Sequence, residues 1–115
     1  MNKELVINTY EDNILLFKEH LLGILENNVL KYENETDSFL LDLEKNIFQK
    51  ENIDSILKIS NSIATLTLKE MGQSFDIALN KHNFINQENK IILEYLLESQ
   101  ESPIKIEIEM SDLNA

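Results

Sequence analysis

Apolar residues recur at intervals of three, four and seven along most of the chain, and the longest such stretch covers residues 53–82. One row of it contains Ile56, Ile59, Ile63 and Leu66. These intervals are typical of one side of an α-helix. Residues 59–68 carry no charge, in a chain that is 27% charged. The pattern therefore predicts a long helix that is surrounded by the rest of the chain or by a partner.

Similar spacing predicts three further helices, over residues 9–32, 37–48 and 86–98. The chain either turns at residues 49–52 or continues there into the long helix, which in turn either bends at Gly72 or runs straight. The sequence holds only two glycines and one proline. So few turn-forming residues argue against a β fold with many turns and favour a few long helices.

The pattern changes after Pro103, where apolar and charged residues alternate strictly up to Met110. Such alternation predicts a β-strand, and a strand must pair because it cannot satisfy its own backbone groups. Its partner is expected to be the apolar patch Leu5-Val6-Ile7, a second copy of the chain, or the sheet edge of another protein. The predicted fold is thus mainly α: a small, elongated antiparallel bundle of three to four helices in residues 1–102. Residues 103–115 add a strand and tail to the same domain.

The charge balance limits the partners. The net charge is −11, from 21 acidic residues and ten basic ones, all of them lysine. Repulsion disfavours nucleic acid and anionic membranes, whereas basic protein partners are favoured. The chain has no cysteine, no secretory signal at its N-terminus and no apolar run near the length that spans a membrane, so a cytoplasmic location is expected.

No motif indicates catalysis or metal binding. Neither His20 nor His82 begins a zinc-binding HExxH, since Ile24 and Asn86 stand four residues later. Neither ends the Glu-x-x-His of a di-iron site, because Phe17 and Leu79 occupy the glutamate positions. The acidic run 33–44 has the spacing of a calcium loop, but Ser38 replaces the glycine that the loop requires, so a solvated acidic loop is expected instead. We therefore expect no enzyme, no cofactor and no metal.

The function predicted from these features is a non-catalytic protein–protein interaction module, such as a helical chaperone, adaptor or assembly factor, with a homodimer as one possible state. It would bind a protein partner through an apolar helical groove with an acidic rim. The alternative is an acidic inhibitor, such as an antitoxin or phage-encoded antagonist, that blocks a basic nucleic-acid-binding site; an enzyme without a recognisable motif ranks below both. Nine residues are expected to contact the partner: Ile59, Ile63, Leu66, Thr67, Met71, Phe75, Ile104, Ile106 and Ile108.

Overall fold

The computed structural model describes residues 1–113, and all the regular structure in that range is β-strand. The prediction of a mainly α helical bundle over residues 1–102 is therefore wrong. Ten antiparallel strands form a closed barrel in which each strand pairs with its neighbours in sequence and β1 pairs with β10. The strands are β1 (Asn2–Glu11), β2 (Ile14–Glu26), β3 (Val29–Glu33), β4 (Ser38–Asp42), β5 (Ile47–Glu51), β6 (Ser55–Ser60), β7 (Ile63–Leu68), β8 (Gln73–Gln87), β9 (Lys90–Leu97) and β10 (Ile104–Asp112).

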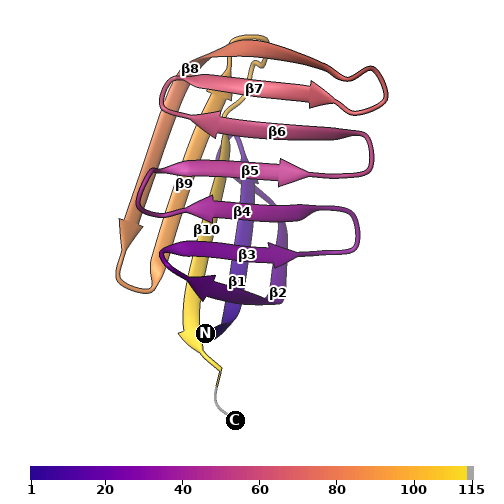
Figure 1. Cartoon of the computed structure of the whole chain (residues 1–115). Helices are drawn as coiled ribbons and strands as arrows, with labels where there is room; N and C mark the ends of the chain where they lie inside the picture. The colour runs from indigo at the N-terminus through magenta and orange to yellow at the C-terminus, as the bar shows by residue number, and fades with distance from the viewer. Residues whose placement is uncertain (114–115) are drawn as a thin grey trace.

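The barrel is flattened into two layers whose strands cross (Figure 1). Strands β3 to β7 form one layer, and β8, β9, β10, β1 and β2 form the other. Two long strands take part in both layers, and we call β2 and β8 the corner strands. β2 pairs with β1 along residues 14–24 and with β3 along residues 23–26. β8 pairs with β7 along residues 73–78 and with β9 along residues 79–87.

Asparagine supplies most of the turns, which is why the shortage of glycine was misleading. Seven described non-glycine residues have a positive φ, and six of them are asparagines. Asparagine tolerates this left-handed conformation because its short side chain bonds to nearby backbone. Four hairpins close through two-residue turns with at least one such residue: Asp12-Asn13, Asn27-Asn28, Asn61-Ser62 and Glu88-Asn89.

The long helix predicted over residues 53–82 is instead β6, β7 and the first part of β8, and the charge-free window spans two of these strands. The row that suggested one helix side is split between two faces. Ile59 is fully buried in the core, whereas Ile63 lies on the outer face and is 49% exposed. Apolar residues on both faces of short strands produce spacings of three and four, which imitate a helical period.

The remaining open points are also decided. The chain turns after β5, where Asn52 accepts hydrogen bonds from the backbone N–H groups of Asp54 and Ser55, both at 2.9 Å. Gly72 has a φ of 62° in the β7–β8 turn rather than at a helix bend. The predicted C-terminal strand is confirmed as part of β10. Of the three alternative partners considered for it, the structure contains the intramolecular one, since Leu5 pairs with Met110 and Ile7 with Ile108.

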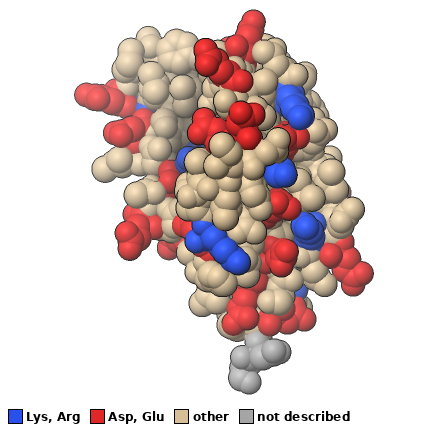
Figure 2. Space-filling view, turned by 180° about the vertical axis from the view of Figure 1, so that it is seen from behind, with Lys and Arg blue, Asp and Glu red and all other residues tan. Residues whose placement is uncertain are grey.

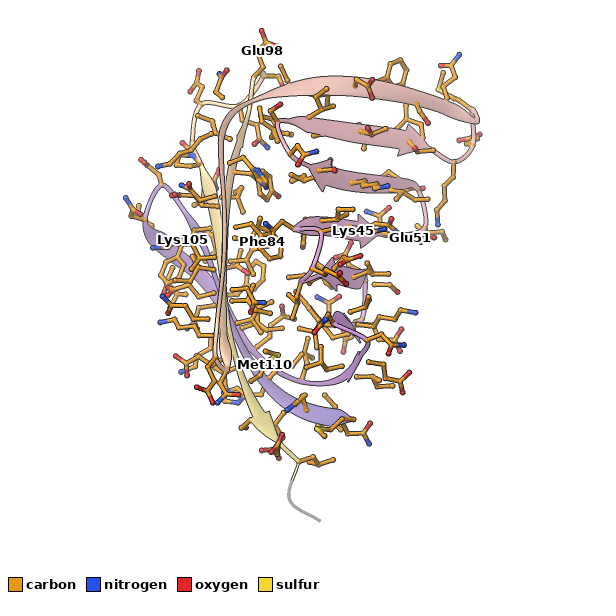
Figure 3. All side chains as sticks on the ribbon, turned by 60° about the vertical axis from the view of Figure 1, so that its left-hand side comes forward. Lys45, Glu51, Phe84, Glu98, Lys105 and Met110 are labelled. Atoms are coloured by element: carbon orange, nitrogen blue, oxygen red, sulfur yellow. The ribbon has the colours of Figure 1, made fainter. Side chains whose placement is uncertain are left out.

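The core fills the space between the two layers. Strands whose inner face is buried contribute alternate residues, as β9 does with Ile91, Leu93, Tyr95 and Leu97. Phe84 and Met110 point into this space, whereas Lys105 lies on the outside (Figure 3). Burying one such apolar side chain contributes about 1.5–3 kcal/mol. A row of aromatic rings joins both layers, with centroids 4.7, 6.1 and 6.2 Å apart from Tyr32 through Phe39 and Phe48 to Tyr95.

Gly23 lies where β2 passes from one layer to the other. A Cβ atom at this position would lie 2.7 Å from Leu5 Cδ1 and 3.1 Å from the carbonyl oxygen of Lys31. The missing side chain therefore lets β1 and β3 approach β2 together at the corner. This close approach places the first part of β2 at the side of one layer, with its outer backbone edge uncovered.

Candidate functional site: the free edge of β2

Corner strand β2 has a stretch of backbone edge without a pairing partner. Along residues 14–22 it pairs with β1 on one side, and pairing with β3 on the other side begins only at Gly23. No strand within residues 1–113 pairs with that second side of the segment. An edge of this kind offers N–H and C=O groups to an incoming strand. We call residues 14–22 the free edge.

The free edge is unusually apolar for an uncovered strand. Four consecutive residues are about half exposed or more: Ile14 at 67%, Leu15 and Leu16 at 50% and Phe17 at 49%. Leu22, at the far end of the same segment, is 64% exposed. Isolated exposed apolar residues are normal, but a contiguous group beside unpaired backbone is the type of surface that associates with another chain.

A groove of about 780 Å³ runs beside the free edge. One wall is β2 itself, with Phe17, Glu19 and Leu21 on the strand face that also carries the core residues of β1. The other wall is the turn between β3 and β4, residues 33–37. We call this hollow the edge groove; it is lined by Phe17, Glu19, His20, Leu21, Glu33, Asn34, Glu35, Thr36 and Asp37.

Asn34 holds the two walls of the edge groove in place. Its side-chain oxygen accepts hydrogen bonds from the backbone N–H of Thr36 at 3.0 Å and of Asp37 at 2.8 Å, which closes the turn. Its side-chain amide donates to Glu19 Oε2 on β2 at 3.2 Å. One residue thus fixes the shape of the turn and its distance from the strand, so that little of the groove has to be ordered on binding.

The edge groove is strongly acidic. Four carboxylates line it, at Glu19, Glu33, Glu35 and Asp37, and no lysine does. Tyr32 on β3 is almost completely buried, and this burial, followed by the nearby charge of Glu19, raises the pKa of the Tyr32 hydroxyl far above its usual value. The tyrosine therefore stays neutral, and the charge of the groove comes from its carboxylates.

A second hollow of about 540 Å³ lies on the outer side of β2 to β5. Its apolar wall is built by Leu22, Ile24 and Leu40, and polar groups such as Gln49 and Glu51 line the rest. Leu22 belongs both to the free edge and to this wall, and Glu33 lines both hollows. The apolar surface of β2 therefore continues beyond the free edge onto the outer face of the other layer.

No metal-binding cluster among the described residues accompanies these hollows. Within residues 1–113, no group of three or more histidine, aspartate or glutamate side chains is arranged to hold a metal ion. His82 has an Nε2 atom that is shielded from solvent and has no hydrogen-bond partner among the described residues. Its burial lowers its pKa. It pairs with Tyr95 on the inner face of β8, away from the edge groove.

The structure does not bring together the nine residues predicted to contact a partner. Three of them lie in the core. Two of these three belong to the C-terminal strand β10, which is already paired with β1 on one side and with β9 on the other. The others are spread over β7, β8, the turn between them and the start of β10. Ile59, Ile106 and Ile108 are buried; Leu66 and Ile104 are partly buried on the inner face; Ile63 and Thr67 lie on the outer face of β7; Met71 is exposed in the β7–β8 turn; and Phe75 is exposed on β8.

Sequence reasoning missed the residues of the free edge because they looked like one side of a helix. The available signal was Asp12-Asn13 followed at once by Ile14-Leu15-Leu16-Phe17: a two-residue turn and then apolar residues without alternation. A strand that is apolar on both faces is either covered on both sides or exposed for association, and this segment is exposed.

No family model, curated protein or solved structure shows significant similarity to the chain. No helix in residues 1–113 could cross a membrane, since that range contains no helix. Function must therefore be inferred from the surfaces of the molecule itself.

Proposed function

We propose that the protein is a non-catalytic binding module that takes up an extended segment of a partner protein as an additional strand on the free edge of β2. The observation that carries this proposal is the coincidence of unpaired backbone with contiguous exposed apolar side chains along residues 14–22. Strand addition uses both, because backbone hydrogen bonds give affinity and alternate side chains give specificity.

Two features support strand addition over association through a flat surface. The edge groove beside the free edge provides space for a strand, and Asn34 holds its far wall in position. A preformed site loses less conformational entropy on binding than a mobile one. The proposal includes no catalytic role and no cofactor. We further propose a cytoplasmic location, which the absence of cysteine from the sequence supports.

Leu15 is the position at which strand addition can be tested. The turn Asp12-Asn13, with φ values of 51° and 64°, makes the flanking residues Glu11 and Ile14 a hydrogen-bonded pair. The next pair, Tyr10 and Leu15, is then a non-hydrogen-bonded one, so the N–H of Leu15 points towards the free edge. Proline at position 15 removes that N–H and leaves the ladder to β1 intact.

The experiment is a selection from a random peptide library on the immobilised wild-type protein, followed by binding measurements on variants. Selected peptides should bind wild type and Leu15→Ala, which keeps the backbone N–H, and should lose at least about tenfold in affinity for Leu15→Pro. Thermal unfolding monitors whether each variant is folded. Equal binding to Leu15→Pro would place the binding site elsewhere and refute strand addition.

The second candidate is an acidic inhibitor that covers a basic nucleic-acid-binding site. The exposed carboxylates Glu33 and Glu35 and the net charge of −11 favour it. Figure 2, which views the molecule from behind Figure 1, shows carboxylates spread over that face with lysines between them. If the protein is an inhibitor of this kind, the Leu15→Pro variant should bind basic surfaces as well as wild type does. This binding should disappear at high salt because exposed charges are then screened.

A further inference from the structure

The chemistry of the edge groove narrows the partner, if the proposed strand addition holds. We infer that the segment added to the free edge is basic, with a lysine or arginine opposite Glu19 and apolar residues two positions before and after it. The inference rests on the proposed function and specifies the side chains that the site would select.

The position of the basic residue follows from the face on which the β2 side chains lie. Phe17, Glu19 and Leu21 alternate along the strand and share the inner face with Thr9, Ile7 and Leu5 of β1, their cross-strand partners. A strand added to the free edge places its own alternate residues opposite this set. Its inward side chains therefore face Phe17, Glu19 and Leu21 in turn, which gives the pattern apolar, any residue, basic, any residue, apolar.

Charge makes the central position selective. Glu19 is partly buried, and Asn34 occupies only one of its two carboxylate oxygens, so the other can accept a further hydrogen bond. Glu33, Glu35 and Asp37 on the opposite wall lie where the end of a long cationic side chain would reach. Hydrogen bonds between ionised partners are about twice as strong as neutral ones, and a like charge at this position would be repelled.

A second copy of the chain is a less suitable occupant. The free edge itself reads ILLFKEHLL, with lysine and glutamate adjacent and the chain as a whole at −11. Two copies would bring two acidic grooves together without a matching basic set. Charge complementarity thus favours a basic segment from a different protein.

The test uses three synthetic peptides as long as the free edge that differ at one position. Each carries alternate valines facing β2 and has Lys, Gln or Glu at the position opposite Glu19. Fluorescence polarisation should give the order Lys, Gln, Glu, with the lysine peptide about tenfold tighter than the glutamine peptide at low salt. High salt should reduce that preference.

Variants of the protein locate the effect. Glu19→Gln keeps an oxygen for Asn34 and removes the charge, so it should abolish the preference for lysine over glutamine without abolishing binding. Glu33→Gln with Glu35→Gln should weaken the lysine peptide about threefold to tenfold. Glu88→Gln with Glu101→Gln is the matched control: it removes the same charge from exposed residues of other turns and should leave binding unchanged.

Each remaining outcome decides against part of the proposal. If all three peptides bind alike and Leu15→Pro abolishes their binding, the basic partner is refuted and strand addition stands. If the lysine peptide binds Leu15→Pro as well as wild type, the site is not the free edge and both fail. A wild-type dimer in light scattering that Leu15→Pro converts to a monomer would show that a second copy occupies the edge, which also refutes a basic partner.

Discussion

The two corner strands have the same place in the barrel but different residues along their unpaired backbone edges. β2 and β8 are the longest strands, with 13 and 15 residues; each passes from one layer to the other, and pairing shifts register once along each. Each also leaves backbone edge unpaired within residues 1–113: β2 over residues 14–22 on its β3 side, and β8 over residues 80–87 on its β7 side and over residues 73–77 on its β9 side. On β2 this part reads ILLFKEHLL, and on β8, over residues 80–87, it reads NKHNFINQ.

The difference shows which edge is protected. Lysine and asparagine side chains on an exposed edge discourage pairing with other chains, because charge repels and asparagine has low β propensity. β8 carries Lys81, which is ion-paired with Glu94 at 3.2 Å, and three asparagines in its unpaired part. β2 has one lysine in a mostly apolar run. The unpaired part of β8 therefore serves as an internal comparison: it shows the composition of an edge that is protected against pairing.

The largest expected effect concerns the bends of the two strands. Gly23→Ala should destabilise the protein by about 1–3 kcal/mol, because the new methyl group meets Leu5 and the backbone of Lys31. Asn80→Ala, at the exposed bend of β8, should change stability by no more than about 0.5 kcal/mol. Urea denaturation measures both. Equal stabilities for wild type and Gly23→Ala would mean that the corner of β2 is not tightly packed.

The next effect separates two turns of the same design. Asn34 and Asn52 each accept two backbone N–H groups, but only Asn34 also donates to a neighbouring strand, at Glu19. Asn52→Ala should cost about 1 kcal/mol and Asn34→Ala about 1–2 kcal/mol. Only Asn34→Ala should also weaken peptide binding. A double-mutant cycle with Glu19→Ala, which removes the acceptor oxygen, tests the Asn34–Glu19 hydrogen bond, and a zero coupling energy would disprove its contribution.

A smaller effect depends on pH. Burial lowers the pKa of His82 in the folded state, whereas the unfolded chain binds the proton near pH 6.5. The stability contributed by neutral His82 is therefore fully present above pH 6.5 and is lost as the pH falls from there through the lowered pKa. His82→Gln should flatten this part of the stability profile. Parallel profiles for wild type and His82→Gln would contradict the assignment.

The smallest change in stability is expected when an apolar residue on the β2 edge and a lysine on the β8 edge are each replaced by the other type. Leu16→Lys on β2 and Lys81→Leu on β8 should each alter unfolding free energy by less than about 1 kcal/mol, since both positions are exposed. Light scattering on heating should nevertheless fall for the first variant and rise for the second. Unchanged scattering in both would indicate that neither edge governs association.

The C-terminal strand could be predicted because each of its faces has one character. Ile104, Ile106 and Ile108 face the core while charged residues face outward, so the period of two is unambiguous. β9 is equally buried on one face, but Ile92 and Leu96 on its other face blur the alternation and suggest a helix. The fold class was predicted wrongly because of such positions, where the outer face of a strand is apolar too.

Turns were the second source of error, and they also explain the missed site. The scarcity of glycine and proline was taken to argue against many turns, yet Asn13, Asn28 and Asn61 form turns with a positive φ. Once Asp12-Asn13 is taken as a hairpin turn, residues 14–17 become a strand with two apolar faces. That such a strand lies at an edge depends on the bend at Gly23, and the sequence alone does not show where a strand changes layer.

The way the barrel closes determines how the chain can reach its native state. Nine of its ten strand pairings join neighbours in sequence, and the tenth joins β1 to β10. Hairpins can therefore form locally and early, whereas closure must bring together segments such as Leu5 and Met110 across almost the whole chain. The two ends of the described chain also lie together, as Lys3 forms an ion pair with Asp112. A short peptide joining these ends, with a new opening at Asn27-Asn28, would make the nine residue pairs of β1 with β10 local and leave only the four pairs of β2 with β3 to close across the chain. This change should speed folding while every pairing of the free edge is kept.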